Sequence, residues 1–227
     1  MEWMRPRLPM LALTASTILV AGCGHDGAAP QVSDFHAPAP ATWKVTAHPL
    51  GRGAFERGNV AFGPDGLALT LPGGTLNGGE LQSVGRTGDG TYTARLRSAG
   101  VPGSISAFFL YRHDYATDSS DELDFEIPAG PPHQAILTVW RRGIKTPVAQ
   151  RKAPLPFDPA AGLHDYAFVR QGRDVTFTVD GRALFRSAKA PDNPLHTIFN
   201  AWYPDWQQPA TPPQQGTMTV SRFTYAP

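Results

Sequence analysis

The stretch SSDELDFEI, residues 119–127, places four acidic side chains within six positions: Asp121, Glu122, Asp124 and Glu126. Acidic residues are poor strand formers, and like charges at close range repel. Successive side chains of a β-strand point to opposite faces. In a strand here, Leu123, Phe125 and Ile127 would share one apolar face, and three acids would share the other. This alternation predicts a strand of a β-sandwich with its core on one side and a row of carboxyl groups on the other.

Short apolar segments separated by turn residues continue through the rest of the chain. They alternate with period two or form brief buried runs, at 66–72, 90–99, 104–111, 121–127, 135–140, 164–170, 174–179 and 217–225. Asp180-Gly181 suits a tight hairpin turn between two of them. Gly and Pro number 23 each, which favours turns over long helices. We predict an all-β sandwich of two antiparallel sheets, without amphipathic helices or internal repeats.

Composition limits the class of partner. The 227 residues are 41% hydrophobic, enough for one domain with a substantial core, and the formal net charge is +1. Lys and Arg form no dense run, so we expect no nucleic acid partner. We expect a monomer. The seven His residues show no metal-ligand spacing, and no metal ligand is assigned.

The N-terminal residues predict export. Residues 1–22 contain a short basic segment and an apolar stretch too short for a membrane span, and they end before Cys23, the single cysteine of the chain. Val20-Ala21-Gly22-Cys23 resembles a bacterial lipobox, which implies a lipid anchor at Cys23. The alternative is an ordinary secretory signal with an incidental cysteine. Residues 23–42 are rich in Ala and Pro and predict a tether, so we expect the folded domain at 43–227.

The three acids on one face suggest glycosidic chemistry. A retaining glycosidase needs two carboxyls about 5–5.5 Å apart, one as nucleophile and one as acid/base. A third carboxylate between them would help to keep one of the pair protonated. A solvated strand face and a calcium site are the alternatives, although 119–127 holds no Lys or Arg and calcium ligands usually come from loops. The residues alone leave these alternatives open.

Several ordered motifs resemble glycoside hydrolase family 16. Glu122-Leu123-Asp124-Phe125-Glu126 is similar to its E-x-D-x-E signature, in the unbulged form of lichenases and xyloglucan enzymes. Supporting segments are GGELQS at 78–83, GDGTYTARLRSAGVPGSISAFFLY at 88–111, HDYAFVRQGRDVTFTVDGRALF at 164–185 and IFNAWYPDW at 198–206. The resemblance implies a concanavalin-A-like β-jelly-roll with a sugar-binding cleft on its concave sheet.

The resemblance also implies residue roles. Glu122 would be the nucleophile and Glu126 the general acid/base, with Asp124 orienting the nucleophile. Substrate-binding positions would be Glu80, Phe109, Tyr111, Trp140, Asn200, Trp202 and Trp206. The aromatic residues have an ordinary alternative as core side chains, and only one of Phe108 and Phe109 can face the cleft. We expect His113 and His164 to be structural or exposed.

The implied activity is that of a retaining endo-β-glucanase acting on β-1,3- or mixed β-1,3/1,4-glucans. The alternatives are a transglycosylase on β-glucan or xyloglucan and a non-catalytic carbohydrate-binding module. We expect no cofactor, and a structural calcium ion is left open. The sequence departs from the lichenase-like pattern at Gln82, where Arg is common, at Thr138, where Asn is common, and after Trp206. These departures concern subsite contacts and loops, and not the three acids. They bear on which glucan is bound more than on whether a glycosidic bond is cleaved.

Overall fold

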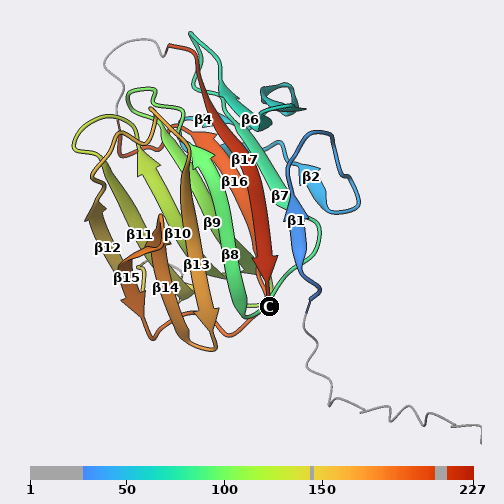
Figure 1. Cartoon of the computed structure of the whole chain (residues 1–227), viewed down its shortest axis with the longest axis vertical. Coiled ribbons are helices and arrows are strands. Elements are labelled where there is room, and N and C mark those ends of the chain that lie inside the picture. The colour runs from blue at the N-terminus through green and yellow to red at the C-terminus, as the bar shows by residue number, and fades with distance from the viewer. Residues whose placement is uncertain (1–27, 144–145, 208–213) are drawn as a thin grey trace, which may run out of the picture.

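Two antiparallel sheets pack face to face in the computed structural model, which describes residues 28–143, 146–207 and 214–227 (Figure 1). An eight-stranded sheet has the order β15 (Arg182–Ser187), β14 (Asp174–Val179), β13 (His164–Gln171), β8 (Gly90–Arg97), β17 (Gly216–Ala226), β6 (Gly66–Leu71) and β5 (Val60–Gly63), with β1 (Gln31–Ser33) beside β17. A seven-stranded sheet has the order β12 (Ala149–Pro154), β11 (Gln134–Gly143), β10 (Ser119–Pro128), β9 (Ile105–Asp114), β16 (His196–Trp202), β7 (Gly79–Ser83) and β2 (Trp43–Val45). The predicted jelly-roll sandwich is confirmed.

Two small elements join the sheets at one end. They are the hairpin of β3 (Pro49–Leu50) and β4 (Gly53–Ala54), and the 3-10 turn η1 (Arg57–Asn59). The described residues contain no α-helix, so none of their helices is long and apolar enough to cross a membrane.

The core lies between the sheets and is rich in aromatic residues among its aliphatic side chains. Phe108 of β9 is fully buried and stacks on Phe199 of β16 at a ring distance of 5.1 Å. The same ring meets Phe168 of the opposite sheet edge-on at 4.9 Å. Phe125 of β10 contacts Phe177 of β14 at 5.4 Å, also across the layer. These edge and offset contacts are the favoured arrangements for aromatic rings. They hold β10 firmly against the eight-stranded sheet.

Strand β10 alternates as its sequence predicts. Leu123, Phe125 and Ile127 are buried in the core at 0–1% exposure, so the intervening acids face away from it. Asp121 is different, because it precedes the alternating acids next to a register shift between β10 and β11. Its carboxylate is buried and accepts hydrogen bonds from the Arg142 backbone N–H at 2.9 Å and from Asn193 Nδ2 at 2.6 Å. Asp121, the acid outside the alternating three, therefore has a structural role.

The predicted hairpin turn is present between β14 and β15. Asp180 and Gly181 have φ values of 48° and 76°, the left-handed conformation that a tight two-residue turn requires. The edge strand β12 was not predicted, because its sequence AQRKAP has no apolar alternation. The strand is defined by its backbone pairing with β11 and not by the pattern of its side chains.

The predicted tether is wrong at its C-terminal end. Residues 31–33 form β1, which pairs with Phe223–Tyr225 of β17, and so extend the eight-stranded sheet. Phe35 is 4% exposed and packs against Trp43 at 5.2 Å, so it belongs to the core. The segment looked like a linker because Ala and Pro surround a strand of only three residues. The predicted signal segment and Cys23 lie outside the described residues.

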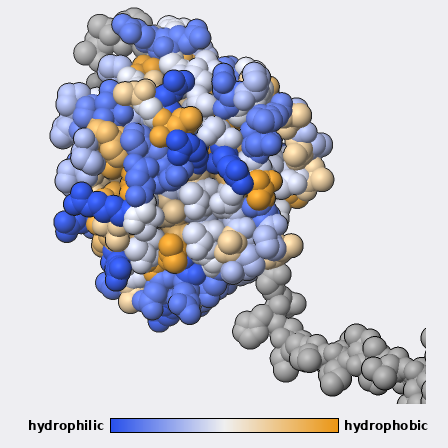
Figure 2. All heavy atoms as spheres, in the orientation of Figure 1, coloured by the Kyte–Doolittle hydropathy of each residue, from blue (hydrophilic) through white to orange (hydrophobic). Residues whose placement is uncertain are grey.

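The view in Figure 1 looks through the sheet that contains β17, β8 and β13 toward the other sheet. On this face, hydrophilic residues predominate and hydrophobic ones are scattered (Figure 2). The chemistry that the sequence predicts lies on the opposite side of the sandwich, on the outer face of the seven-stranded sheet.

Candidate active site

A cleft of about 760 Å³ crosses the seven-stranded sheet. Its lining comes from β12, β11, β10, β9, β16 and β7 in turn, and it ends at His48 and Leu50 beside the β3–β4 hairpin. All ten predicted catalytic and substrate-binding residues line it: Glu80, Phe109, Tyr111, Glu122, Asp124, Glu126, Trp140, Asn200, Trp202 and Trp206. The fold therefore brings together side chains from segments up to 126 residues apart.

The three acids occupy consecutive outward positions of β10. Their partners on β9 are Tyr111 for Glu122, Phe109 for Asp124 and Ala107 for Glu126, in an uninterrupted register. On the β11 side the register shift lies before Glu122, so the strand is regular through the acids. The predicted unbulged strand is present, and alternate residues of such a strand lie about 7 Å apart at the backbone.

The sheet withdraws all three carboxyl groups from bulk water. The pKa of Glu122 is raised to about 7, because burial and repulsion from Glu126 raise it more than a hydrogen bond with Asp124 lowers it. Burial also raises the pKa of Glu126 to about 7. Both side chains keep partial exposure to the cleft. Both glutamates therefore have a pKa near neutral pH, the range that suits a general acid/base.

Asp124 lies between the two glutamates and is buried, with 6% exposure. Burial and the charges of Glu122 and Glu126 raise its pKa well above the usual range, while a hydrogen bond from the Trp140 indole lowers it. The shared hydrogen bond raises the pKa of Asp124 and lowers that of Glu122. Burial therefore disfavours ionisation of both carboxyl groups, and a proton between Asp124 and Glu122 would relieve the repulsion of the pair.

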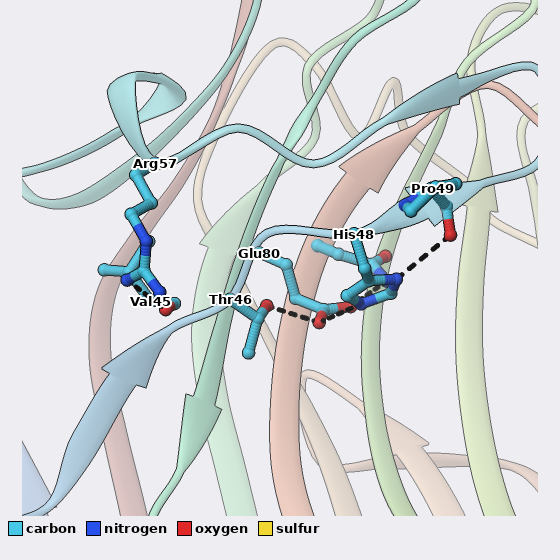
Figure 3. Close-up of polar contacts among 7 residues, drawn as sticks. Val45, Thr46, His48, Pro49, Arg57 and Glu80 are labelled. Atoms are coloured by element: carbon cyan, nitrogen blue, oxygen red, sulfur yellow. Dashed lines mark hydrogen bonds and ion pairs between the residues drawn. The ribbon is translucent and has the colours of Figure 1, made fainter.

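A second polar cluster lies two and three strands from β10, on β16 and β7. Glu80 is 4% exposed and faces its strand partner Asn200. Its Oε1 accepts hydrogen bonds from Thr46 Oγ1 at 2.6 Å and His48 Nε2 at 3.1 Å (Figure 3). Its Oε2 accepts one from Asn200 Nδ2 at 3.1 Å. A buried carboxylate with three donors is held rigidly at the cleft wall.

Aromatic rings line the cleft beside the two polar clusters. Phe109 and Tyr111 form an edge-on pair at 6.4 Å, and Trp202 and Trp206 form another at 5.5 Å. Trp206 is 60% exposed at the rim. The register places Phe108 in the core, which settles that Phe109 is the one facing the cleft. Aromatic faces beside a few fixed polar groups suit a ligand with apolar C–H faces and hydroxyl groups.

The sequence did not predict three polar lining residues, His48, Gln150 and Lys152, or Thr46, which donates a hydrogen bond to Glu80. His48 and Thr46 belong to a segment without strand periodicity, and Gln150 and Lys152 belong to the polar edge strand β12. Nothing local distinguishes them from surface residues, because they reach the site through pairings with β7 and β11. Within residues 28–143, 146–207 and 214–227, no group of three or more His, Cys, Asp or Glu side chains is arranged to hold a metal ion.

Fold and site together define a concanavalin-A-like jelly roll with a cleft that bears carboxyl groups. Comparison with known proteins gives the family. The sequence model of Glycosyl hydrolases family 16 matches residues 52–221, three quarters of the chain, and the protein belongs to this family.

Individual relatives are moderately similar. The endo-1,3-1,4-beta-glycanase ExoK of Rhizobium meliloti (strain 1021) is 31% identical over 130 residues, which are 56% of this chain and 48% of ExoK. A beta-glucanase of Bacillus amyloliquefaciens is 29% identical over 145 residues, 63% of this chain and 60% of the relative. The alignments thus span about half to three fifths of these proteins. The solved structure of Bacillus licheniformis beta-glucanase has the same fold, with a TM-score of 0.77 over 88% of this chain and 99% of that one, at 21% identity.

Proposed function

We propose that the protein is a retaining endo-β-glucanase that hydrolyses β-1,3- or mixed β-1,3/1,4-glucans. The observation that carries the proposal is the regular register of Glu122, Asp124 and Glu126 on one outward face, inside a cleft lined by aromatic residues. Family membership and the printed activities of ExoK and the Bacillus beta-glucanase support the substrate class.

The proposed reaction has two steps. The Glu122 carboxylate attacks the anomeric carbon while Glu126 donates its proton to the leaving glycosidic oxygen, which forms a glycosyl-enzyme ester and frees one half of the glucan. Glu126 then accepts a proton from water as the water oxygen attacks the same carbon and releases Glu122. Asp124, which holds a proton beside Glu122, stabilises the carboxylate before attack and after release.

The cleft geometry also supports internal cleavage. It is an open channel across six strands, with Lys152 of β12 at one end and His48 at the other. An extended chain can lie across the acids of β10 with sugar units on both sides. Glu80, Asn200 and the Trp202–Trp206 pair are proposed to hold units on the β7 side, and Trp140 with Thr138 those on the β12 side.

A substrate panel tests the proposal. Purified protein is incubated with lichenan, laminarin and xyloglucan, and new reducing ends, product lengths and the anomer first formed are followed. We expect new reducing ends, oligomeric products and a first-formed β-anomer. Redistributed chain lengths without new reducing ends would instead indicate a transglycosylase, and binding without either would indicate a carbohydrate-binding module.

A matched pair of variants links activity to the site. Glu122→Gln removes the nucleophile and should reduce turnover at least about 10⁴-fold while glycan binding persists. Glu56→Gln makes the same chemical change at an exposed carboxylate that contacts Asn77 outside the cleft, and should leave activity unchanged. Normal turnover by Glu122→Gln would reject the assigned nucleophile.

We also propose that the protein is exported and anchored to the cell envelope by a lipid at Cys23. The proposal rests on the lipobox-like Val20-Ala21-Gly22-Cys23 after a basic and apolar segment. Cys23→Ser, expressed in a bacterial host, should move the protein out of the membrane fraction. An unchanged distribution of wild type and variant would favour an ordinary secretory signal.

A further inference from the structure

His48 makes two polar contacts that define its protonation state. Its Nδ1 lies 3.0 Å from the Pro49 carbonyl oxygen, and its Nε2 lies 3.1 Å from Glu80 Oε1 (Figure 3). A carbonyl and a carboxylate oxygen are acceptors, so each contact requires an N–H on the ring. Both contacts are made together only by the doubly protonated imidazolium. The two contacts therefore favour the cationic ring at the end of the cleft.

The fold holds this ring in place. The His48 backbone carbonyl accepts from the Phe55 N–H at 2.9 Å, and the Phe55 ring meets the imidazole edge-on at 5.2 Å. The β3–β4 hairpin that follows is tied to the residue after β16, since the Arg52 N–H donates to the Tyr203 carbonyl at 2.9 Å. Gly51 adopts a φ of 55° there, and a Cβ would come within 2.4 Å of the same carbonyl. The hairpin therefore fits against the cleft wall in one position.

Glu80 has acceptor capacity left on the side of Asn200. Its Oε1 already receives both Thr46 and His48, whereas Oε2 receives Asn200 Nδ2. Asn200 is 2% exposed, and its Oδ1 has no hydrogen-bond partner among the described residues. A buried amide oxygen at a cleft wall without a partner indicates a missing donor. Oε2 and Oδ1 together would accept hydroxyl groups of a bound sugar.

We propose that His48 is a positioning residue: its positive charge orients the Glu80 carboxylate for the sugar, and makes glycan affinity depend on pH. This inference rests on the proposed function. Because β9 and β16 separate Glu80 from the acids of β10, the effect falls on binding and not on bond cleavage.

The surroundings of His48 give the direction of the pH effect. Burial lowers the pKa of His48, but the hydrogen bonds to Pro49 and Glu80 and the charge of Glu80 outweigh it, so the pKa lies above its ordinary value. Glu80 of β7 is the charged group acting on the ring, the contacts from Pro49 and Phe55 are uncharged, and Arg57 of η1 donates to the Val45 carbonyl (Figure 3). As pH rises through this pKa, the ring keeps a single N–H, and the Pro49 and Glu80 contacts compete for it.

Binding measured without turnover tests the proposal. The probe is a mixed-linkage β-glucan tetrasaccharide, titrated calorimetrically into Glu122→Gln between pH 5.5 and 9. Affinity should fall about tenfold as pH rises, the effect of losing a hydrogen bond to a charged group. Adding His48→Gln, which keeps a neutral donor, should remove this fall in affinity and leave only the pH dependence that Glu126 contributes. Adding Thr46→Val, which removes the uncharged donor to the same oxygen, should weaken binding equally at every pH.

The outcomes separate the two proposals. No binding at any pH would reject the proposed function, whereas binding with a flat pH profile, or an unchanged profile in the His48→Gln variant, would reject only the role of His48. Ring-nitrogen NMR, assigned by the signal lost in His48→Gln, gives a readout without glycan. We expect two protonated ring nitrogens at pH 6.5 and a lower titration midpoint in Glu80→Gln. A midpoint that Glu80→Gln leaves unchanged would contradict the coupling.

Discussion

The side-chain amide of Gln150 donates a hydrogen bond to Thr138 Oγ1 at 3.2 Å, across the β11–β12 pair. Thr138 is also the β11 partner of Asp124 and lines the cleft beside it. Lichenase-like sequences resembling this one often have Asn at the position of Thr138. Here the amide comes from the neighbouring edge strand, so the wall of the cleft beside the acids keeps an amide group through a different residue.

Gln150→Ala tests this arrangement. Loss of the amide should raise KM for the glucan about fivefold with little change in kcat, the effect of one neutral hydrogen bond. Steady-state kinetics on the best substrate of the panel measure it. Gln171→Ala, at an exposed position of β13 on the other sheet, is the control and should leave both constants unchanged. A fall in kcat at constant KM would place Gln150 in the chemical step instead.

Two variants of Asp124 test whether this residue acts as a hydrogen-bond donor or as a negative charge. Asn keeps a neutral N–H beside Glu122, whereas Ala removes the donor. We expect Asp124→Ala to lower kcat/KM about 10- to 150-fold, because a hydrogen bond to a charged group is worth about 1.5–3 kcal/mol, and Asp124→Asn to retain most of the activity. Equal losses in both variants would show that Asp124 acts by its negative charge.

The pH profile of kcat/KM should be a narrow bell centred near pH 7. Activity needs Glu122 ionised and Glu126 protonated, and burial raises the pKa of both to about 7. The two limbs belong to the coupled pair. Glu126→Gln, assayed on an aryl glycoside whose leaving group needs no protonation, should lose the alkaline limb and keep the acidic one. An alkaline limb that survives would assign it to another group.

The same raised pKa predicts a cost in stability. The unfolded chain ionises Glu126 near its ordinary pKa of about 4.3, and the folded state does so near 7. Between these values the folded state binds more protons, so stability falls as pH rises. Glu126→Gln removes this titration and should raise the free energy of unfolding by roughly 1–3 kcal/mol at pH 8 and little at pH 4. Urea unfolding at both pH values measures it, and an equal effect at both would contradict the sign.

Phe108 should dominate the stability of the layer beneath the cleft. It contacts rings of both sheets, so Phe108→Ala leaves a cavity and should cost about 3–5 kcal/mol in urea unfolding. Val169→Ala on β13, where Val169 is 44% exposed, should change stability by less than about 0.5 kcal/mol. A small effect at Phe108 would mean that the core closes around the missing ring.

Local sequence determined which faces of the strands are apolar and which turns connect them. The alternation at 121–127 was enough to separate core from cleft, because the period of two is a property of the extended backbone. Asp180-Gly181 marked its hairpin for a similar local reason, the left-handed conformation of both residues. The adjacent residues Phe108 and Phe109 could not be assigned in this way. The sequence was compatible with either ring in the core and the other in the cleft.

Only the tertiary structure decided which distant residues meet. Glu80 and Asn200 are 120 residues apart, and their contact depends on the pairing of β7 with β16. His48 is positioned by its contacts with Glu80 and Pro49, and Gln150 by the pairing of its strand with β11, although neither residue lies in a segment with a recognisable period. Pairings between strands are set by packing of the whole sandwich, which short segments do not encode. The three acids were therefore readable from the sequence, whereas the electrostatic environment that gives each its role comes from the fold.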